Sequence, residues 1–178
     1  MYNKSKELFN LSTFKEYILN IDSYCKKKIL GIDFGTSKIG LSTFSFETDF
    51  VLPLGTHHRS KTLQTDMKFF ADLIQKERIC GIIIGVSIIK DFRTGEMRFG
   101  NEKLFQLSVF FLNSLNDFLE SLGLKPIQYR FFDESFTTIF ANQYLHAYNF
   151  SHPAKQKAQD KLAATTILQE ALNDMEFI

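Results

Sequence analysis

Residues 29–46 read ILGIDFGTSKIGLSTFSF, in which the short polar stretch Gly35-Thr36-Ser37 separates two apolar runs. Apolar runs of this length that are broken by a glycine-containing turn predict two strands joined as a β-hairpin. A third apolar stretch over residues 51–58 predicts one more strand of the same meander. The main domain of the chain is therefore expected to begin with antiparallel strands.

After this meander the chain alternates between helical and strand-like patterns. Apolar residues recur at helical spacing, and each such stretch leads into a short apolar run typical of a buried strand. The expected elements are a helix over 63–77, a strand over 81–86, a polar loop over 87–100, a helix over 104–122, a strand over 127–132, and helical segments over 137–148 and 156–175 separated by Ser151-His152-Pro153. This order predicts an α/β fold with a mixed five-stranded sheet flanked by helices.

The amino-terminal region has its own pattern. Leu11, Phe14 and Ile18 recur at helical spacing, and three lysines at 26–28 follow them. The spacing predicts an amphipathic helix, and we expect it to pack on its own domain rather than to recruit a partner. The expected organisation is an N-terminal helical extension over residues 1–27 and a main domain over residues 28–178.

The charge balance and the cysteines limit the class of protein. Among 178 residues, 21 are Lys or Arg and 20 are Asp or Glu, which gives a formal net charge of +1. Such a chain has no strong global field for nucleic acid, although a local basic patch is compatible with it. No apolar run approaches the roughly 18 residues of a membrane span. With no secretory signal pattern and with Cys80 expected to be a buried free thiol, the sequence predicts a cytoplasmic protein without membrane contact.

One carboxylate stands inside the first strand. By the period of two, Asp33 shares a strand face with Gly31 and Gly35, while Leu30, Ile32 and Phe34 share the other face. An unpaired charge in an apolar strand is costly, and we expect the glycines to leave room beside it for an ion or a phosphate. Alternatively, Asp33 initiates the turn by accepting hydrogen bonds from the amides that follow.

Two further carboxylates lie in the segment Asp133-Glu134, where an apolar strand ends and a helix is expected to begin. Strand parity sends the two side chains to opposite faces, so one of them is expected to share a site with Asp33. The other is expected to cap the following helix at Thr137-Thr138. In the alternative reading both acids are capping residues.

A fourth carboxylate, Asp160, is expected near the start of the last helix. Ala163, Ala164 and Ile167 follow it at helical spacing, so Asp160 lies on the apolar face and points inward. The two small alanines let the helix approach the sheet closely. The alternative is a favourable charge at a helix amino terminus.

Three converging carboxylates suit Mg²⁺ or Mn²⁺, which prefer oxygen ligands, better than zinc. The adjacent His57 and His58 would face opposite ways on a strand, and no zinc site is expected from them. Divalent ions beside a phosphodiester orient water and stabilise the attacking and leaving oxygens. The residues therefore indicate hydrolytic cleavage of phosphodiester bonds.

Four segments also resemble, in order and spacing, the YqgF/RuvX family: IDFGTSKIG at 32–40, IIIGVS at 82–87, FFDESFTT at 131–138 and DKLAATTILQEAL at 160–172. That family has an RNase H-like fold. It is named for its similarity to the RuvC Holliday-junction resolvases and is described as a nuclease that matures the 5′ end of pre-16S rRNA. The resemblance implies the same fold here, and a hydrolase of ribosome biogenesis that processes rRNA.

Carried over to this chain, the resemblance places the catalytic and metal-binding acids at Asp33, Glu134 and Asp160. Ser135 stands where the family usually has arginine, and Ser87 stands where it usually has proline. The expected substrate contacts are Gly35, Thr36, Lys38, Thr137, Lys155 and Lys157.

Pre-16S rRNA is the expected partner, bound by a monomer or a homodimer. Two other functions stay open, namely a resolvase of four-way DNA junctions, which should act as a dimer, and a catalytically silent RNA-binding or assembly factor. The motif DFGTSKIG also looks like the phosphate-binding hairpin of the actin, sugar-kinase and Hsp70 superfamily. Those proteins close two such domains around ATP, and this chain has room for one.

Overall fold

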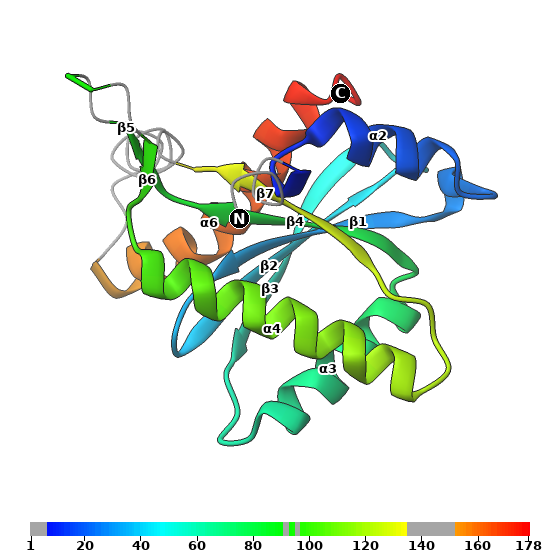
Figure 1. Cartoon of the computed structure of the whole chain (residues 1–178), viewed down its shortest axis with the longest axis horizontal. Coiled ribbons are helices and arrows are strands. Elements are labelled where there is room, and N and C mark those ends of the chain that lie inside the picture. The colour runs from blue at the N-terminus through cyan, green and yellow to red at the C-terminus, as the bar shows by residue number, and fades with distance from the viewer. Residues whose placement is uncertain (1–6, 91–92, 95–96, 135–151) are drawn as a thin grey trace.

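The computed structural model describes residues 7–90, 93–94, 97–134 and 152–178, and over 152–161 it describes the backbone alone. Its central feature is a five-stranded sheet of order β3-β2-β1-β4-β7 (Figure 1). The strands are β1 (Lys28–Phe34), β2 (Lys38–Ser45), β3 (Phe50–His58), β4 (Ile79–Val86) and β7 (Gln128–Asp133). β2 is antiparallel to both of its neighbours, whereas β1, β4 and β7 are parallel to one another. This confirms the predicted mixed five-stranded sheet.

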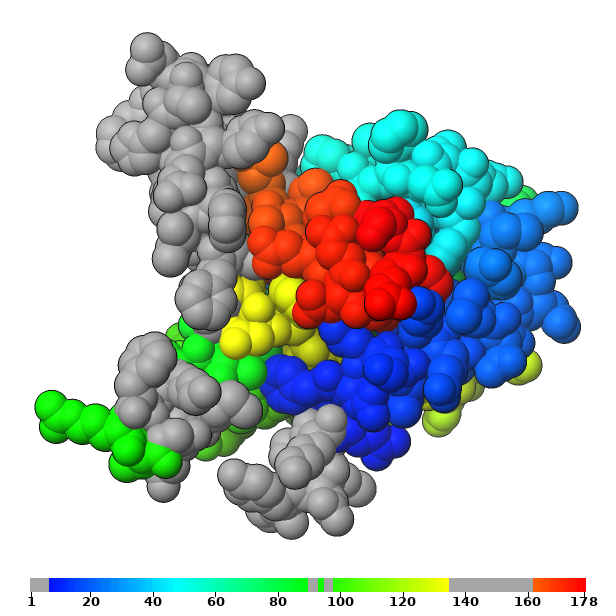
Figure 2. Space-filling view, turned by 90° about the horizontal axis from the view of Figure 1, so that it is seen from above, coloured from blue at the N-terminus to red at the C-terminus, as the bar shows by residue number. Residues whose placement is uncertain are grey.

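Helices cover both faces of the sheet. On one face, α3 (Leu63–Lys76) and α4 (Glu102–Ser121) form the crossovers that parallel strands require. On the other face lie α2 (Leu11–Leu19), the short 3₁₀ helix η1 (Tyr24–Lys26) and α6 (His152–Asp174). Figure 2 shows the end of α6, in red, against the amino-terminal residues, in blue. Two hydrophobic cores, one on each side of the sheet, hold the layers together.

The segment predicted as a polar loop over 87–100 contains a second small sheet, so that prediction was incomplete. β5 (Ile88–Lys90) pairs antiparallel with β6 (Met97–Phe99), and the pair projects from the body of the domain (Figure 1). The Gly100 N–H donates a 2.7 Å hydrogen bond to the Ser87 carbonyl and closes the base of this hairpin. Strands this short carry no periodic pattern by which a sequence could reveal them.

The last helix begins earlier than predicted. α6 starts at His152, whereas the sequence indicated a break over Ser151-His152-Pro153 and a helix from Gln156. Proline is tolerated in the first turn of a helix because its missing N–H would have no partner there. Pro153 therefore lies inside the first turn of α6. The helical segment predicted over 137–148 lies outside the described residues.

The paired alanines of α6 do bring this helix close to the sheet. Ala164 is fully buried, and its carbonyl accepts a 2.7 Å hydrogen bond from the Ser42 hydroxyl of β2. Gly31 of β1 lies directly beneath, because a Cβ there would meet Ser42, Leu168 and the Ala164 carbonyl. The prediction of a close approach is confirmed.

The amino-terminal helix packs on its own domain, as expected. Phe14 and Ile18 of α2 are fully buried against Gly81 of β4. Arg130 of β7 donates to the Asn10 carbonyl that begins this helix, and its guanidinium lies 5.8 Å from the centre of the Phe14 ring. The division into residues 1–27 and 28–178 stays a prediction.

Two expectations about the environment of the chain can be compared with the structure. Cys25 and Cys80 are both free, and Cys80 is buried, as predicted. No helix in the described part of the chain combines the length and the apolarity that a membrane span needs.

Candidate active site

Asp33 lies in a row of residues that runs across the sheet near the carboxyl end of β1. On one side its register partner is Gly85 of β4, and on the other it is Gly40 of β2, which in turn pairs with Thr56 of β3. Residues in register share a face of the sheet. Asp33 therefore has a glycine on each flanking strand, and a half-buried carboxylate stands where its neighbours carry no side chain.

This arrangement corrects the sequence-based explanation of the space beside Asp33. The glycines of its own strand do not leave room, because a Cβ at Gly31 would meet Ser42 and α6, and a Cβ at Gly35 would meet the Lys38 carbonyl. The glycines that leave room beside Asp33 are Gly40 and Gly85 on the neighbouring strands. They are identified by the pairing of β1 with β2 and β4, and the sequence alone does not show which residues of adjacent strands pair.

Glu134 approaches Asp33 from the end of β7. Its backbone N–H donates a 3.0 Å hydrogen bond to the Val86 carbonyl, which extends the pairing of β7 with β4 by one residue. Its carboxylate lies against Gly85, at the position that a Cβ would otherwise fill. Glu134 and Asp33 are therefore neighbours across Gly85, as predicted for one carboxylate of the Asp133-Glu134 segment.

The electrostatics of Glu134 reflect this crowding. Burial, followed by the negative charges of Asp33 and Asp133, raises the pKa of Glu134 to about 7. Asp133 points elsewhere, because its carboxylate accepts a 3.2 Å hydrogen bond from the Ile88 N–H. The expected cap on the helix at Thr137 lies outside the described residues.

The third predicted acid, Asp160, lies in the interior of α6 rather than at its start. The stabilisation of an acid by a helix amino terminus fades within the first turn, so that alternative explanation of Asp160 is not supported. The side chains of Asp160, Lys155 and Lys157 lie outside the described part of the structure, as does Thr137. Within the described residues, no three His, Cys, Asp or Glu side chains gather as a metal site would require.

The β1–β2 hairpin places two of the predicted substrate contacts, Gly35 and Lys38, beside Asp33. A pocket of about 70 Å³ is lined by Asp33, Gly35, Lys38, Gly40 and Thr56. Lys38 is half-buried there and supplies a positive charge next to the carboxylate. Thr36 is exposed in the turn and does not line this pocket.

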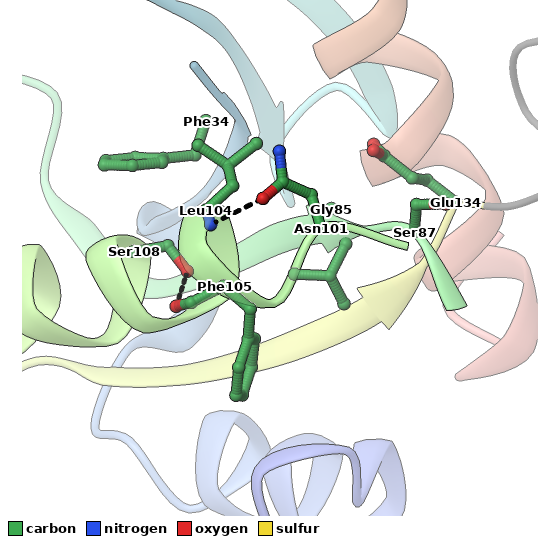
Figure 3. A pocket seen from close by; sticks show the side chains of 9 residues that line it. Phe34, Gly85, Ser87, Asn101, Leu104, Phe105, Ser108 and Glu134 are labelled. Atoms are coloured by element: carbon green, nitrogen blue, oxygen red, sulfur yellow. Dashed lines mark hydrogen bonds between the residues drawn. The ribbon is translucent and has the colours of Figure 1, made fainter. Parts of the chain in front are cut away.

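Glu134 also lines a second pocket, of about 50 Å³, which is shown in Figure 3. Its walls come from the ends of β1 and β4 and from the first turns of α4. Ser87 and Asn101 stand at its rim, and Phe34, Leu104 and Phe105 form apolar walls. The sequence analysis missed this pocket, because nothing in the spacing of Ser87 and Asn101 shows that the base of the β5–β6 hairpin brings them together.

The sequence also did not reveal a hydrogen-bond network around Asp66, which holds the turn of the β1–β2 hairpin in place. The buried Asp66 accepts hydrogen bonds from His57 Nε2 (2.9 Å) and from the Ser60 N–H (2.8 Å), and Arg59 Nε lies 3.6 Å from its other oxygen. The Arg59 N–H in turn donates to the carbonyl of Ser37 in the turn. His57 is thus part of this hydrogen-bond network.

Several known proteins are similar to this chain in sequence. A curated relative from Protochlamydia amoebophila, named "Putative pre-16S rRNA nuclease", is 31% identical over 153 residues, which cover 82% of this chain and 93% of the relative. A relative of the same name from Anaplasma marginale is 27% identical over 148 residues, which cover 83% of this chain and 85% of that one.

Solved structures of resolvases are also similar. The Thermus thermophilus RuvC structure with a Holliday junction substrate matches with a TM-score of 0.45 and 12% identity, over 84% of this chain and 96% of that one. A yeast mitochondrial Holliday junction resolvase matches with a TM-score of 0.43 and 11% identity, over 93% of this chain and 89% of that one.

The family itself is established by a match over most of the chain. The family model described as "RuvX: Holliday junction resolvase" matches residues 27–174. The matched range includes β1, β4, β7 and α6, which carry the four motifs that the sequence analysis singled out. The family model and the curated relatives are named as nucleases or resolvases, which confirms the predicted enzyme class, a hydrolase of phosphodiester bonds. The chain belongs to the RuvX family.

Proposed function

We propose that this chain is a divalent-metal-dependent nuclease whose metal is held by Asp33, Glu134 and Asp160. The observation that carries the proposal is the meeting of the Asp33 and Glu134 carboxylates across Gly85, with the pKa of Glu134 raised to about 7. Two like charges at close quarters repel each other, which raises a pKa in the metal-free protein and is relieved by a cation between them. Carboxylate oxygens are the ligands that Mg²⁺ and Mn²⁺ prefer, so the residues present fit such an ion.

A divalent ion bound there supplies activation of water and stabilisation of the oxygens that enter and leave at phosphorus. The chain positions the substrate. Lys38 lies beside Asp33 in the hairpin pocket, where its ammonium suits a backbone phosphate. The Gly35 and Thr36 turn follows β1 directly, and we assign to its backbone N–H groups a phosphate contact at the same edge. We assign further phosphate contacts to Lys155, Lys157 and Thr137.

The substrate that we propose is RNA, namely the 5′ leader of pre-16S rRNA. The name shared by the curated relatives supports it, since one of them is 31% identical and aligned over 93% of its length. Both cysteines are free, as a reducing cytoplasm requires, and we propose that the protein acts there. The description of the family model favours a second candidate, the resolution of four-way DNA junctions.

Cleavage assays separate these functions. The purified protein is incubated with Mg²⁺ or Mn²⁺ and with a labelled pre-16S leader RNA or a labelled four-way DNA junction. Asp33→Asn and Glu134→Gln remove one carboxylate each, and Asp72→Asn makes the same change at an exposed position of α3. We expect RNA cleavage that needs the metal, is lost in the first two variants and is kept in the third.

Other results contradict the proposal. Cleavage confined to the junction, together with dimers in sedimentation analysis, assigns the chain to resolvases. RNA binding without cleavage of either substrate, and without Mn²⁺ binding in calorimetry, identifies a silent binding factor. Equal cleavage by Asp33→Asn rejects the carboxylate site.

A further inference from the structure

The pocket of Figure 3 contains a hydrogen-bond donor whose direction is fixed. The Asn101 Oδ1 accepts a 3.0 Å hydrogen bond from the Leu104 N–H and so caps α4. A flipped amide would direct its NH₂ group at that N–H, so the cap determines which end of the amide faces outward. The Asn101 nitrogen therefore points into the space between Phe34 and Glu134 (Figure 3). It has no hydrogen-bond partner within the described residues.

A second donor stands beside it. The 2.7 Å bond from the Gly100 N–H to the Ser87 carbonyl holds the chain before β5 against the chain after β6. Gly100 allows this contact, because a Cβ there would lie 2.7 Å from the Ser87 hydroxyl oxygen. Ser87 is exposed at the rim of the pocket, and within the described residues its hydroxyl likewise has no partner. A hydroxyl and an amide thus share one small opening.

The residues that line the pocket limit which ligands the Asn101 amide and the Ser87 hydroxyl can bind. Phe34, Leu104 and Phe105 are apolar, and Glu134 also lines the pocket. A phosphate would lose its hydration against apolar walls and would be repelled by Glu134. A neutral group with a carbonyl oxygen on its edge fits both the walls and the donors. The rings of Phe34 and Phe105 are packed against Phe111 and Phe99, so the pocket offers an edge contact rather than a stacking surface.

We propose that this pocket takes the carbonyl edge of one nucleobase next to the cleaved bond, with the carbonyl oxygen accepting from Asn101 and Ser87. Uracil, cytosine and guanine carry such an oxygen, whereas adenine does not. The proposal rests on the proposed nuclease function, because it places the base beside the carboxylate site. It makes the enzyme selective for sequence at one position of single-stranded substrate, where base edges are accessible.

The test removes the Asn101 NH₂ donor and keeps a capping side chain at the start of α4. Serine and aspartate cap helices as well as asparagine does, so Asn101→Ser and Asn101→Asp preserve α4 while removing the NH₂ group. Asn10→Ser is the matched control, since Asn10 caps α2 in the same way through the Thr13 N–H. Side-chain amide signals are recorded by ¹H–¹⁵N NMR with Ca²⁺ present, during titration with short oligouridylate and oligoadenylate strands. The Asn101 signal is the one absent from both Asn101 variants.

We expect oligouridylate to shift the Asn101 signal and to bind about three- to tenfold more weakly to both Asn101 variants, the loss of one hydrogen bond. Oligoadenylate should bind wild type and Asn101→Ser alike, any weakening by Asn101→Asp that is common to both strands reports its added charge, and Asn10→Ser should behave as wild type. A loss of affinity that is equal for both oligonucleotides would indicate a phosphate contact and contradict base reading. Shifts around Asp33 without a shift of Asn101 overturn this proposal alone, whereas no shift anywhere overturns it together with the proposed function.

Discussion

The Glu134 carboxylate lies against the backbone of Gly85, at the position where any other residue would carry its Cβ. Gly85 is also the register partner of Asp33, so this one missing side chain lets two carboxylates from different strands meet. Ile167 of α6 fills the rest of the same space. The candidate site therefore depends on a residue that contributes no functional group.

Gly85→Ala should separate the carboxylates. The added methyl group displaces Glu134 and Ile167, and we expect Mn²⁺ affinity, measured by calorimetry, to fall at least tenfold. Overpacking should also lower the free energy of unfolding by about 1–3 kcal/mol. Gly81→Ala is the matched control, because it crowds Phe14 and Ile18 near the other end of β4. Equal Mn²⁺ affinity in the two variants would show that Gly85 does not position the site.

The stability of the metal-free protein should fall as pH rises. Because the pKa of Glu134 is raised to about 7, the folded state keeps a proton that the unfolded state releases near its ordinary value of 4.5. The unfolded state thus binds fewer protons between these values, and the free energy of unfolding decreases through that window, by on the order of 3 kcal/mol. Urea denaturation in a chelating buffer measures it. Glu134→Gln should remove this slope, and an unchanged slope would assign it to another group.

Asp33 contributes to the high pKa of Glu134 through its charge, after burial and before Asp133. Asp33→Asn should therefore lower the pKa of Glu134, but not to its ordinary value, because burial remains. Asp133→Asn should lower it less. Carboxyl ¹³C NMR titration of the metal-free protein follows both variants. A larger effect of Asp133→Asn would mean that Asp33 is not the closer neighbour.

Asp66 should stabilise the protein through its hydrogen bonds beside the β1–β2 hairpin. Burial acts to raise the pKa of this acid, but hydrogen bonds from His57 and Ser60 outweigh it and lower the pKa. Asp66→Asn leaves part of this network unpaired, and we expect a loss of about 1–3 kcal/mol in urea denaturation. Asp72→Asn, an exposed position of the same helix, should change stability by less than about 0.5 kcal/mol. Equal losses of unfolding free energy in the two variants would show that the Asp66 network does not stabilise the protein.

The amino-terminal helix should be part of the folding unit. Phe14→Ala removes a fully buried ring between α2 and β4, and we expect a loss of about 3–5 kcal/mol. Leu19→Ala, at a residue of α2 that is 44% exposed, should cost far less. Thermal denaturation followed by circular dichroism checks both variants. A negligible effect of Phe14→Ala would support an extension that folds apart from residues 28–178.

The sequence by itself determined the order of the strands along the chain, the two crossover helices and the inward face of each element. These properties follow from local periodicity: Leu30, Ile32 and Phe34 alternate with Gly31 and Asp33, and each set was assigned to the correct face of β1. Strand alternation also indicated Asp33 and one acid of Asp133-Glu134, and the family motifs selected Glu134, which the structure brings near Asp33.

Tertiary structure alone decided what surrounds those acids. Gly40 and Gly85 flank Asp33 because of strand register, which depends on long-range pairing and leaves no local trace. Ser87 meets Asn101 because the β5–β6 hairpin closes between them, and Asp66 joins His57 to Arg59 because α3 folds back on β3. Periodicity specifies which way a side chain points, whereas only the packing of distant segments specifies what it faces.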